Sequence, residues 1–177
     1  MLANTVYLTS HNRIDQPELD MSNVLTRIFI DTLVLSGSLL AETDREKEFV
    51  IWLAQHDQYA MGNGTVSFSL DEMPWEPNHF KENKFFMLRM IEQALQGAGW
   101  ERLSYTPIDK DIRYALTAFR ELILLFGKDD IDTNHYKYWR TMEEDDSSHT
   151  ISKGYPKCDK HEVYLSCFGC VLCNGET

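Results

Sequence analysis

The residues best suited to chemistry lie at the C-terminal end of the sequence, where four cysteines gather in the last twenty residues. Two pairs with a gap of two residues stand in this segment: Cys158 with His161, and Cys170 with Cys173. Such a gap lets both ligands of a tight turn reach one ion, and zinc binds four thiolate or imidazole ligands as a tetrahedron. The spacing therefore predicts a structural zinc site made by Cys158, His161, Cys170 and Cys173.

A second ligand set remains open, in which Cys167 replaces His161 and all four cysteines bind the ion. We favour the set with His161, because Cys167, Cys170 and Cys173 together would crowd three ligands onto a short segment. Four protein ligands would leave no open coordination position, so we expect the ion to help fold this segment rather than to catalyse a reaction.

Eight residues separate the two pairs of the favoured set, which suits a short hairpin. We expect a strand at 163–165 and a bend at 168–169. Asn174 and Gly175 tolerate positive φ, so we expect their backbone to turn back and offer amides to the thiolates.

Other interpretations of the cysteines are two disulfides, a redox pair and unconnected thiols. The absence of a secretion signal argues against disulfides. A redox pair at Cys170 and Cys173 lacks a preceding βαβ pattern that would lower a thiol pKa. Unconnected thiols would not all fall in one short segment.

The elements that must position this segment form a mainly helical body. Apolar side chains recur at helical spacing in four segments. We expect helices at 22–40, 43–61, 78–96 and 109–126. Ser22 marks the start of the first, Thr43 and Glu46 form a capping box for the second, and Asn78 is expected to cap the third.

The remaining pattern predicts short extended pieces. Residues 1–20 contain Pro17 and a single apolar cluster at 6–8, so we expect them to be extended. Residues 66–70 alternate between apolar residues and serine, and residues 100–105 also look extended. A short fifth helix is expected at 133–142. The fold class predicted is mainly α: a helical bundle of about four helices with a short β element and a small C-terminal zinc-bound hairpin.

Charge suggests where the chain divides. Residues 128–150 carry three basic and seven acidic side chains, including the run at 143–146, whereas residues 151–177 carry three of each. We therefore expect a helical body at 1–127, an acidic polar connector at 128–150 and a C-terminal zinc-binding module at 151–177.

Composition excludes several classes of protein. Of the 177 residues, 43% are hydrophobic, which is enough for a core and excludes wholesale disorder. The net charge of −11 argues against binding to nucleic acid or anionic lipid. No run approaches about 18 apolar residues, and no signal-peptide pattern is present. These features predict a cytoplasmic protein that binds no membrane.

Three other acidic or histidine-containing motifs are possible catalytic or cation sites. His56 and Asp57 stand side by side, as in metal-dependent phosphohydrolases, but no further histidine is spaced to join them, so we expect an ordinary packed histidine. Asp71 and Glu72, and the acidic run at 143–146, lack the spacing of a calcium loop.

Two aromatic segments suggest either contact surfaces or packing. Trp75 stands between two prolines in the segment 73–77, where it would be held rigidly; we favour a place in the core. Tyr136, Tyr138 and Trp139 lie beside the acidic run, where they either contact a partner or dock the connector onto the body.

Taken together, these features predict a non-enzymatic zinc-binding protein that acts through contact with another protein. A concrete form is an acidic inhibitor or immunity-type protein that covers a basic partner. The alternatives are a nucleic-acid-associated regulator using the Cys/His tail, and a helical metal-dependent hydrolase using His56 and Asp57.

Overall fold

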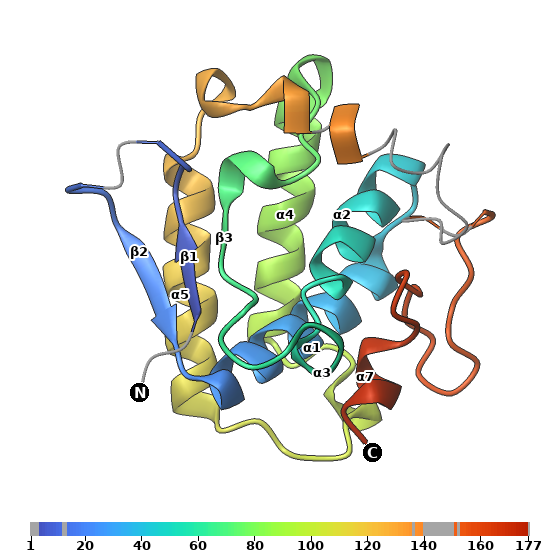
Figure 1. Ribbon diagram of the computed structural model, residues 1–177. Coiled ribbons are helices and arrows are strands. Elements are labelled where there is room, and N and C mark those ends of the chain that lie inside the picture. Colours follow the sequence, from blue (N-terminus) through green and yellow to red (C-terminus); the bar gives the residue numbers. More distant parts are fainter. Residues whose placement is uncertain (1–3, 12–13, 136, 140–150, 152, 177) are drawn as a thin grey trace.

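The computed structural model describes residues 4–11, 14–135, 137–139, 151 and 153–176 (Figure 1). The fold is mainly helical with a small mixed sheet, as the sequence predicts. Its four long described helices are α1 (Asn23–Leu40), α2 (Asp44–Ala54), α4 (Phe80–Leu95) and α5 (Asp109–Leu125). Two short helices are α3 (Gln58–Met61) and α7 (Val171–Asn174). Single 3-10 turns lie at Leu70–Glu72, Pro77–His79, Trp100–Arg102 and Lys128–Asp130.

The helix α1 is central and contacts α2, α4 and α5. Ser22 caps it as predicted, since its side chain accepts a hydrogen bond from the Leu25 amide at 3.2 Å. By length and composition α1 could cross a membrane, which the sequence analysis did not anticipate. However, 67% of this stretch is buried inside the fold, which is typical of a core helix.

Gly37 allows close packing of α1 on its neighbours. A Cβ atom at this position would lie 2.6 Å from Met90 Sδ and 2.6 Å from Val50 Cγ2. Because the β-branched Val50 cannot easily rotate away, we expect Gly37→Ala to lower the free energy of unfolding by about 1–3 kcal/mol. Urea unfolding of this variant should show a lower midpoint. Gly127→Ala is the control, since its Cβ would meet only Asp130 Oδ2 at 3.4 Å; equal midpoints for both variants would contradict the prediction.

The predicted second helix proves to be two helices. Its start is confirmed: Thr43 Oγ1 accepts from the Glu46 amide at 3.2 Å, and Glu46 Oε2 accepts from the Thr43 amide at 3.0 Å. The helix ends at Ala54, however, rather than near residue 61. Asp57 caps a new start, because its Oδ1 accepts from the Tyr59 amide at 2.9 Å and begins α3.

The sheet joins segments that are far apart in the sequence. Strand β1 (Asn4–Tyr7) pairs antiparallel with β2 (Glu18–Met21) and parallel with β3 (Phe68–Ser69). Val6 stands opposite both Leu19 and Phe68, and all three side chains are buried. The predicted strand at 66–70 is shortened to two residues because the chain turns into a 3-10 helix at Leu70. In the view of Figure 1 the strands lie on the left and the C-terminal segment on the right.

Two local predictions on either side of α4 differ from the structure. Asn78 does not cap α4; His79 occupies that position, and its side chain makes no hydrogen bond to the first amides of the helix, because Pro77 first starts a 3-10 turn. Residues 100–105 are not uniformly extended, since Trp100–Arg102 form another 3-10 turn.

The predicted fifth helix is described only in part. Residues 133–135 and 137–139 are helical, whereas residues 140–142 lie outside the described residues. The acidic run at 143–146 and the side chain of Tyr136 also lie outside them.

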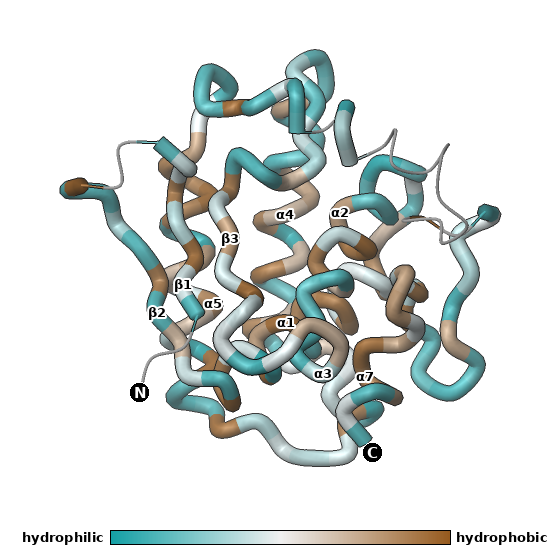
Figure 2. Tube along the Cα trace, viewed as in Figure 1, coloured by the Kyte–Doolittle hydropathy of each residue, from teal (hydrophilic) through white to brown (hydrophobic). Residues whose placement is uncertain are grey.

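Trp75 is part of the core, as favoured from the sequence. Its side chain is 0% exposed, and its indole Nε1 donates to the Leu70 carbonyl at 2.7 Å. Its ring stacks on Phe126 at a centroid distance of 5.1 Å and meets the edge of Phe49 at 5.0 Å. Figure 2 shows apolar residues along the packed helices and hydrophilic loops at the top of the molecule.

The C-terminal segment packs on the helical body. Its apolar side chains join the same core; they are Val163, Tyr164, Val171 and Leu172. Ser38, near the end of α1, provides polar anchors: its carbonyl accepts from Lys157 Nζ at 3.1 Å, and its hydroxyl accepts from the Tyr164 amide at 3.2 Å. The body therefore supplies the surface on which the candidate metal ligands are arranged.

Candidate metal centre

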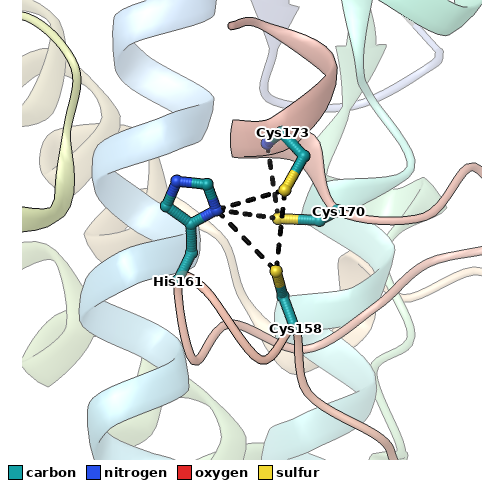
Figure 3. A group of neighbouring side chains, drawn as sticks. All are labelled: Cys158, His161, Cys170 and Cys173. Atoms are coloured by element: carbon teal, nitrogen blue, oxygen red, sulfur yellow. Dashed lines mark hydrogen bonds between the residues drawn. The ribbon is translucent and has the colours of Figure 1, made fainter.

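The four ligands favoured from the sequence lie around one point (Figure 3). His161 Nδ1 lies 3.3 Å from Cys173 Sγ, 3.6 Å from Cys170 Sγ and 3.7 Å from Cys158 Sγ. The sulfurs of Cys158 and Cys173 are 3.6 Å apart, and all four ligand atoms lie within 4.8 Å of one another.

These distances fit a tetrahedral zinc ion. With Zn–S bonds of about 2.3 Å and a Zn–N bond of about 2.0–2.1 Å, tetrahedral geometry puts two sulfurs about 3.8 Å apart and nitrogen about 3.6 Å from sulfur. Three soft thiolates and one imidazole are also the donor types that zinc prefers. The cluster is therefore a candidate Cys3His site of the zinc type.

A tight turn brings the first pair of ligands together. The Glu162 amide donates to the Cys158 carbonyl at 2.8 Å, and the Cys158 amide donates to the Val163 carbonyl at 2.9 Å. Glu162 has a φ of 56°, which lets the chain reverse directly after His161. The two-residue gap thus places the Cys158 and His161 side chains on the same side of the turn.

The second pair lies at the start of a helix. Cys170 caps α7, and its sulfur accepts from the Cys173 amide at 3.5 Å. Cys173 follows within the first turn, so both sulfurs face the same point. Between the two pairs the chain turns back on itself, because Lys157 and Tyr164 form an antiparallel bridge.

Two finer expectations about this segment are wrong. Residues 163–165 form no extended strand; the only bridges described here join Lys157 with Tyr164 and Ser166 with Gly169. Gly175 has an ordinary right-handed backbone with φ of −79° and so does not turn amides back toward the sulfurs. The predicted bend at 168–169 does occur, and Gly169 has a φ of 86°.

Cys167 stands apart from the cluster. Its side chain is exposed, and it does not belong to the group of converging ligand atoms. Of the two ligand sets considered, the structure therefore brings together the one with His161.

Glu176 orients the histidine ligand and was missed from the sequence. Its Oε1 lies 2.9 Å from His161 Nε2, and its other oxygen pairs with Lys160. The Lys160 ammonium and then His161 hold the pKa of the Glu176 carboxyl below its usual range. An ionised carboxylate at Nε2 keeps the proton there and leaves the Nδ1 lone pair for an ion. No spacing rule connects Glu176 to the ligands, so only the folded structure reveals it.

We expect Glu176→Gln to weaken zinc binding about 10–100-fold, because the amide no longer fixes the imidazole through a charged hydrogen bond. Competition with a chromophoric chelator would measure the affinity. Glu162→Gln is a matched control, since Glu162 pairs with Arg102 rather than with a ligand side chain. Equal affinities for the two variants would refute this role of Glu176.

Side chains of the body hold the cluster in place. Arg102 Nη1 donates to the His161 carbonyl at 3.3 Å, and Arg27 Nη2 donates to the Gly175 carbonyl at 3.1 Å. Asn174 Nδ2 donates to Asp57 Oδ2 at 2.8 Å. The ligands are thus tied to α1, to α3 and to the 3-10 turn that follows α4.

The interior position of the cluster bears on its chemistry. Burial raises the pKa of the Cys170 thiol to about 12, because a thiolate there has lost its water. A divalent cation at the centre would supply the missing stabilisation, since a coordinating thiol is deprotonated by the ion. The Cys170 sulfur therefore suits binding to a cation rather than the role of a free thiolate nucleophile.

His56 and Asp57 do not form a joint site. The His56 ring packs against Trp52 and Phe68, with centroid distances of 4.1 Å and 4.9 Å, and its Nδ1 lies 2.8 Å from the Trp52 carbonyl. Asp57 instead caps α3 and accepts from Asn174. The two side chains have separate structural roles, which gives no support to a catalytic metal pair.

Asp71 and Glu72 also have structural partners. Asp71 accepts from the amide and the hydroxyl of Ser10, and Glu72 accepts from the Ser69 amide at 2.7 Å. Within the described part of the chain, the Cys3His cluster is the one group of such side chains whose ligand atoms converge on a point.

The structure thus supports a candidate metal site of three cysteines and one histidine at the C-terminal segment. Comparisons of the chain with protein-family models, with curated proteins and with solved structures find no match, so no relative lends this site a function.

Proposed function

We propose that this chain is a zinc-binding protein in which the ion fastens the C-terminal segment to the helical body, and that it acts through contact with another protein. The observation that carries the proposal is the convergence of four ligand atoms within 4.8 Å, at distances that fit a zinc tetrahedron. Four protein ligands complete the coordination of zinc, so the ion is structural and offers no position to a substrate.

The partner is proposed to be basic. The net charge of −11 would attract a positively charged surface and speed its association. A hollow of about 400 Å³ concentrates that charge, since Asp71, Asp129, Asp130 and Asp132 all line it. An acidic inhibitor or immunity-type protein that covers a basic partner would use such a surface.

Native mass spectrometry of the protein purified gently from its own host tests both parts of the proposal. We expect the mass of the chain plus one zinc ion, together with a second chain in the complex. A chain that is free of metal would overturn the zinc assignment, and a chain that carries zinc but no partner would overturn the contact role.

The basic character of the partner is tested separately by the rate of association. Changing Asp129, Asp130 and Asp132 to asparagine should slow association and flatten its dependence on salt. The control changes three exposed acids of α5, Asp109, Asp111 and Glu121, to amides. Association that is insensitive to salt, or equally slowed in both variants, would refute an acidic docking surface.

A further inference from the structure

A cavity of about 240 Å³ lies beside the end of α2, and aromatic side chains dominate its lining. Trp52 and His56 line one part of it, and Tyr138 and Trp139 another. Glu72 contributes a carboxylate. The volume is below the roughly 300–1,000 Å³ of pockets for drug-sized molecules, so the cavity suits a small head group rather than a large ligand.

The first wall is rigid. Trp52 and His56 are one helical turn apart, and their ring centroids lie 4.1 Å from each other. Phe68 supports both rings: its centroid is 5.0 Å from that of Trp52 and 4.9 Å from that of His56. Trp52 is only 5% exposed, so it supports this wall from the core, and the half-buried His56 ring presents more surface to a ligand. Such a packed wall needs no ordering when a ligand enters.

The second wall comes from the helical residues 133–135 and 137–139. His135, Tyr138 and Trp139 are spaced i, i+3 and i+4, which places them on one face of a helix. Trp139 Nε1 donates to Gln55 Oε1 at 2.9 Å, which fixes its indole at the end of α2. Tyr138 is 66% exposed, so the cavity opens to solvent on this side.

The charge of the cavity favours a cation. The described residues that line it include neither lysine nor arginine. The Ser69 amide donates to Glu72 at 2.7 Å and holds its carboxylate in place. Burial lowers the pKa of His56 to about 4, so its ring is neutral near pH 7 and does not repel a positive ligand. Asp132 does not line the cavity, but its carboxylate lies 3.6 Å from Nε2 of the lining residue His135.

We propose that this cavity binds an alkylated ammonium group, the group shared by choline-type molecules and trimethylated lysine side chains. Such a cation is attracted to the faces of tryptophan and tyrosine rings, and its methyl groups pack on apolar walls without needing hydrogen bonds. The Glu72 carboxylate adds an opposite charge. This site is separate from the zinc cluster, and either proposal can fail without the other.

Titration of the zinc-loaded full chain with choline tests the proposal. The control ligand is 3,3-dimethylbutan-1-ol, which has the shape of choline without its charge. Tryptophan fluorescence reports binding, since two of the four tryptophans line the cavity. We expect saturable binding of choline at least about tenfold tighter than that of the alcohol. Equal binding of both ligands, or no binding of choline at millimolar concentration, would overturn the proposal.

A second titration distinguishes the two sources of the group. A peptide with one trimethyllysine is compared with the same peptide carrying unmodified lysine. Tighter binding of the methylated peptide than of choline would assign the cavity to a protein partner, whereas the reverse order would assign it to a small molecule. Equal binding of the modified and unmodified peptides would refute a methylated side chain as the source and assign the choline that binds to a small-molecule role.

Variants connect the binding to this cavity. Trp139→Leu and Glu72→Gln should each weaken choline binding about tenfold, because one removes a ring face and the other a charge. Trp100→Leu is the matched control, because Trp100 does not line the cavity. Unchanged affinity in both cavity variants would refute the site. If Trp139→Leu fails to fold, the comparison of choline with its neutral analogue still tests whether the cavity recognises the positive charge.

Discussion

Replacing Cys170 with serine is expected to reduce the zinc content of the purified protein from one ion per chain to none. Cys170 is the most enclosed of the three cysteine ligands, and it belongs to the cluster in which all ligand atoms lie within 4.8 Å of one another. A serine hydroxyl does not ionise at neutral pH and is a harder ligand than a thiolate, so it cannot complete a zinc tetrahedron. Elemental analysis after gel filtration measures the loss.

The same variant should loosen the C-terminal segment while the body stays helical. Most of the shared core lies among the long helices around α1, whereas we propose that the C-terminal segment relies on the ion for much of its order. Far-UV circular dichroism should therefore change little, while limited proteolysis should cut between residues 153 and 176 much faster than in the wild type.

Cys167→Ser provides the matched control for this experiment. It makes the same chemical change three residues away, at an exposed cysteine outside the cluster. We expect this variant to keep one zinc ion and the proteolysis rate of the wild type. Loss of zinc in both variants would favour the alternative ligand set with Cys167, and retention of zinc in Cys170→Ser would refute the proposed ligand role of Cys170.

Trp75→Ala is expected to lower the free energy of unfolding by about 3–5 kcal/mol, the largest effect predicted for a change in the body. The indole fills the space between Phe49 and Phe126, and alanine would leave a cavity there. The variant also leaves the Leu70 carbonyl without its indole donor. Urea unfolding followed by circular dichroism would measure the loss.

Trp75→Phe separates these two contributions, because it keeps an aromatic ring and removes the indole donor. We expect a loss between those of wild type and Trp75→Ala. Tyr114→Ala is the surface control: Tyr114 is 58% exposed on α5, so its removal should change stability by less than about 0.5 kcal/mol. A similar cost at Trp75 and Tyr114 would mean that Trp75 does not pack in the core.

Local sequence patterns predicted the long helices and the four candidate metal ligands. Helical periodicity identified α1 and α5 almost to the residue: α5 buries one continuous apolar face, whereas α1 is buried on all sides over residues 28–38. Two-residue gaps selected Cys158, His161, Cys170 and Cys173, because such gaps are set by the reach of a single turn.

Features that depend on distant partners were not predictable in this way. The parallel pairing of Val6 with Phe68 joins distant segments of the chain in the folded body. The sequence of neither strand indicates which other strand it will pair with. Glu176 reaches His161 because α7 turns it toward the ring. The break after Ala54 depends on Asp57, whose second carboxylate oxygen is held by Asn174, far along the chain.

The packing of the C-terminal segment has a consequence for how the protein matures in a cell. The helices of the body are synthesised before the cluster residues, so the surface around Ser38 is already present when the ligands emerge. If the proposed ion orders this segment, a chain that lacks zinc at this moment would expose apolar side chains such as Val163 and Leu172, which are buried in the folded protein. Exposed apolar segments are what cellular proteases and chaperones select, so the supply of zinc should set how many copies of this protein persist.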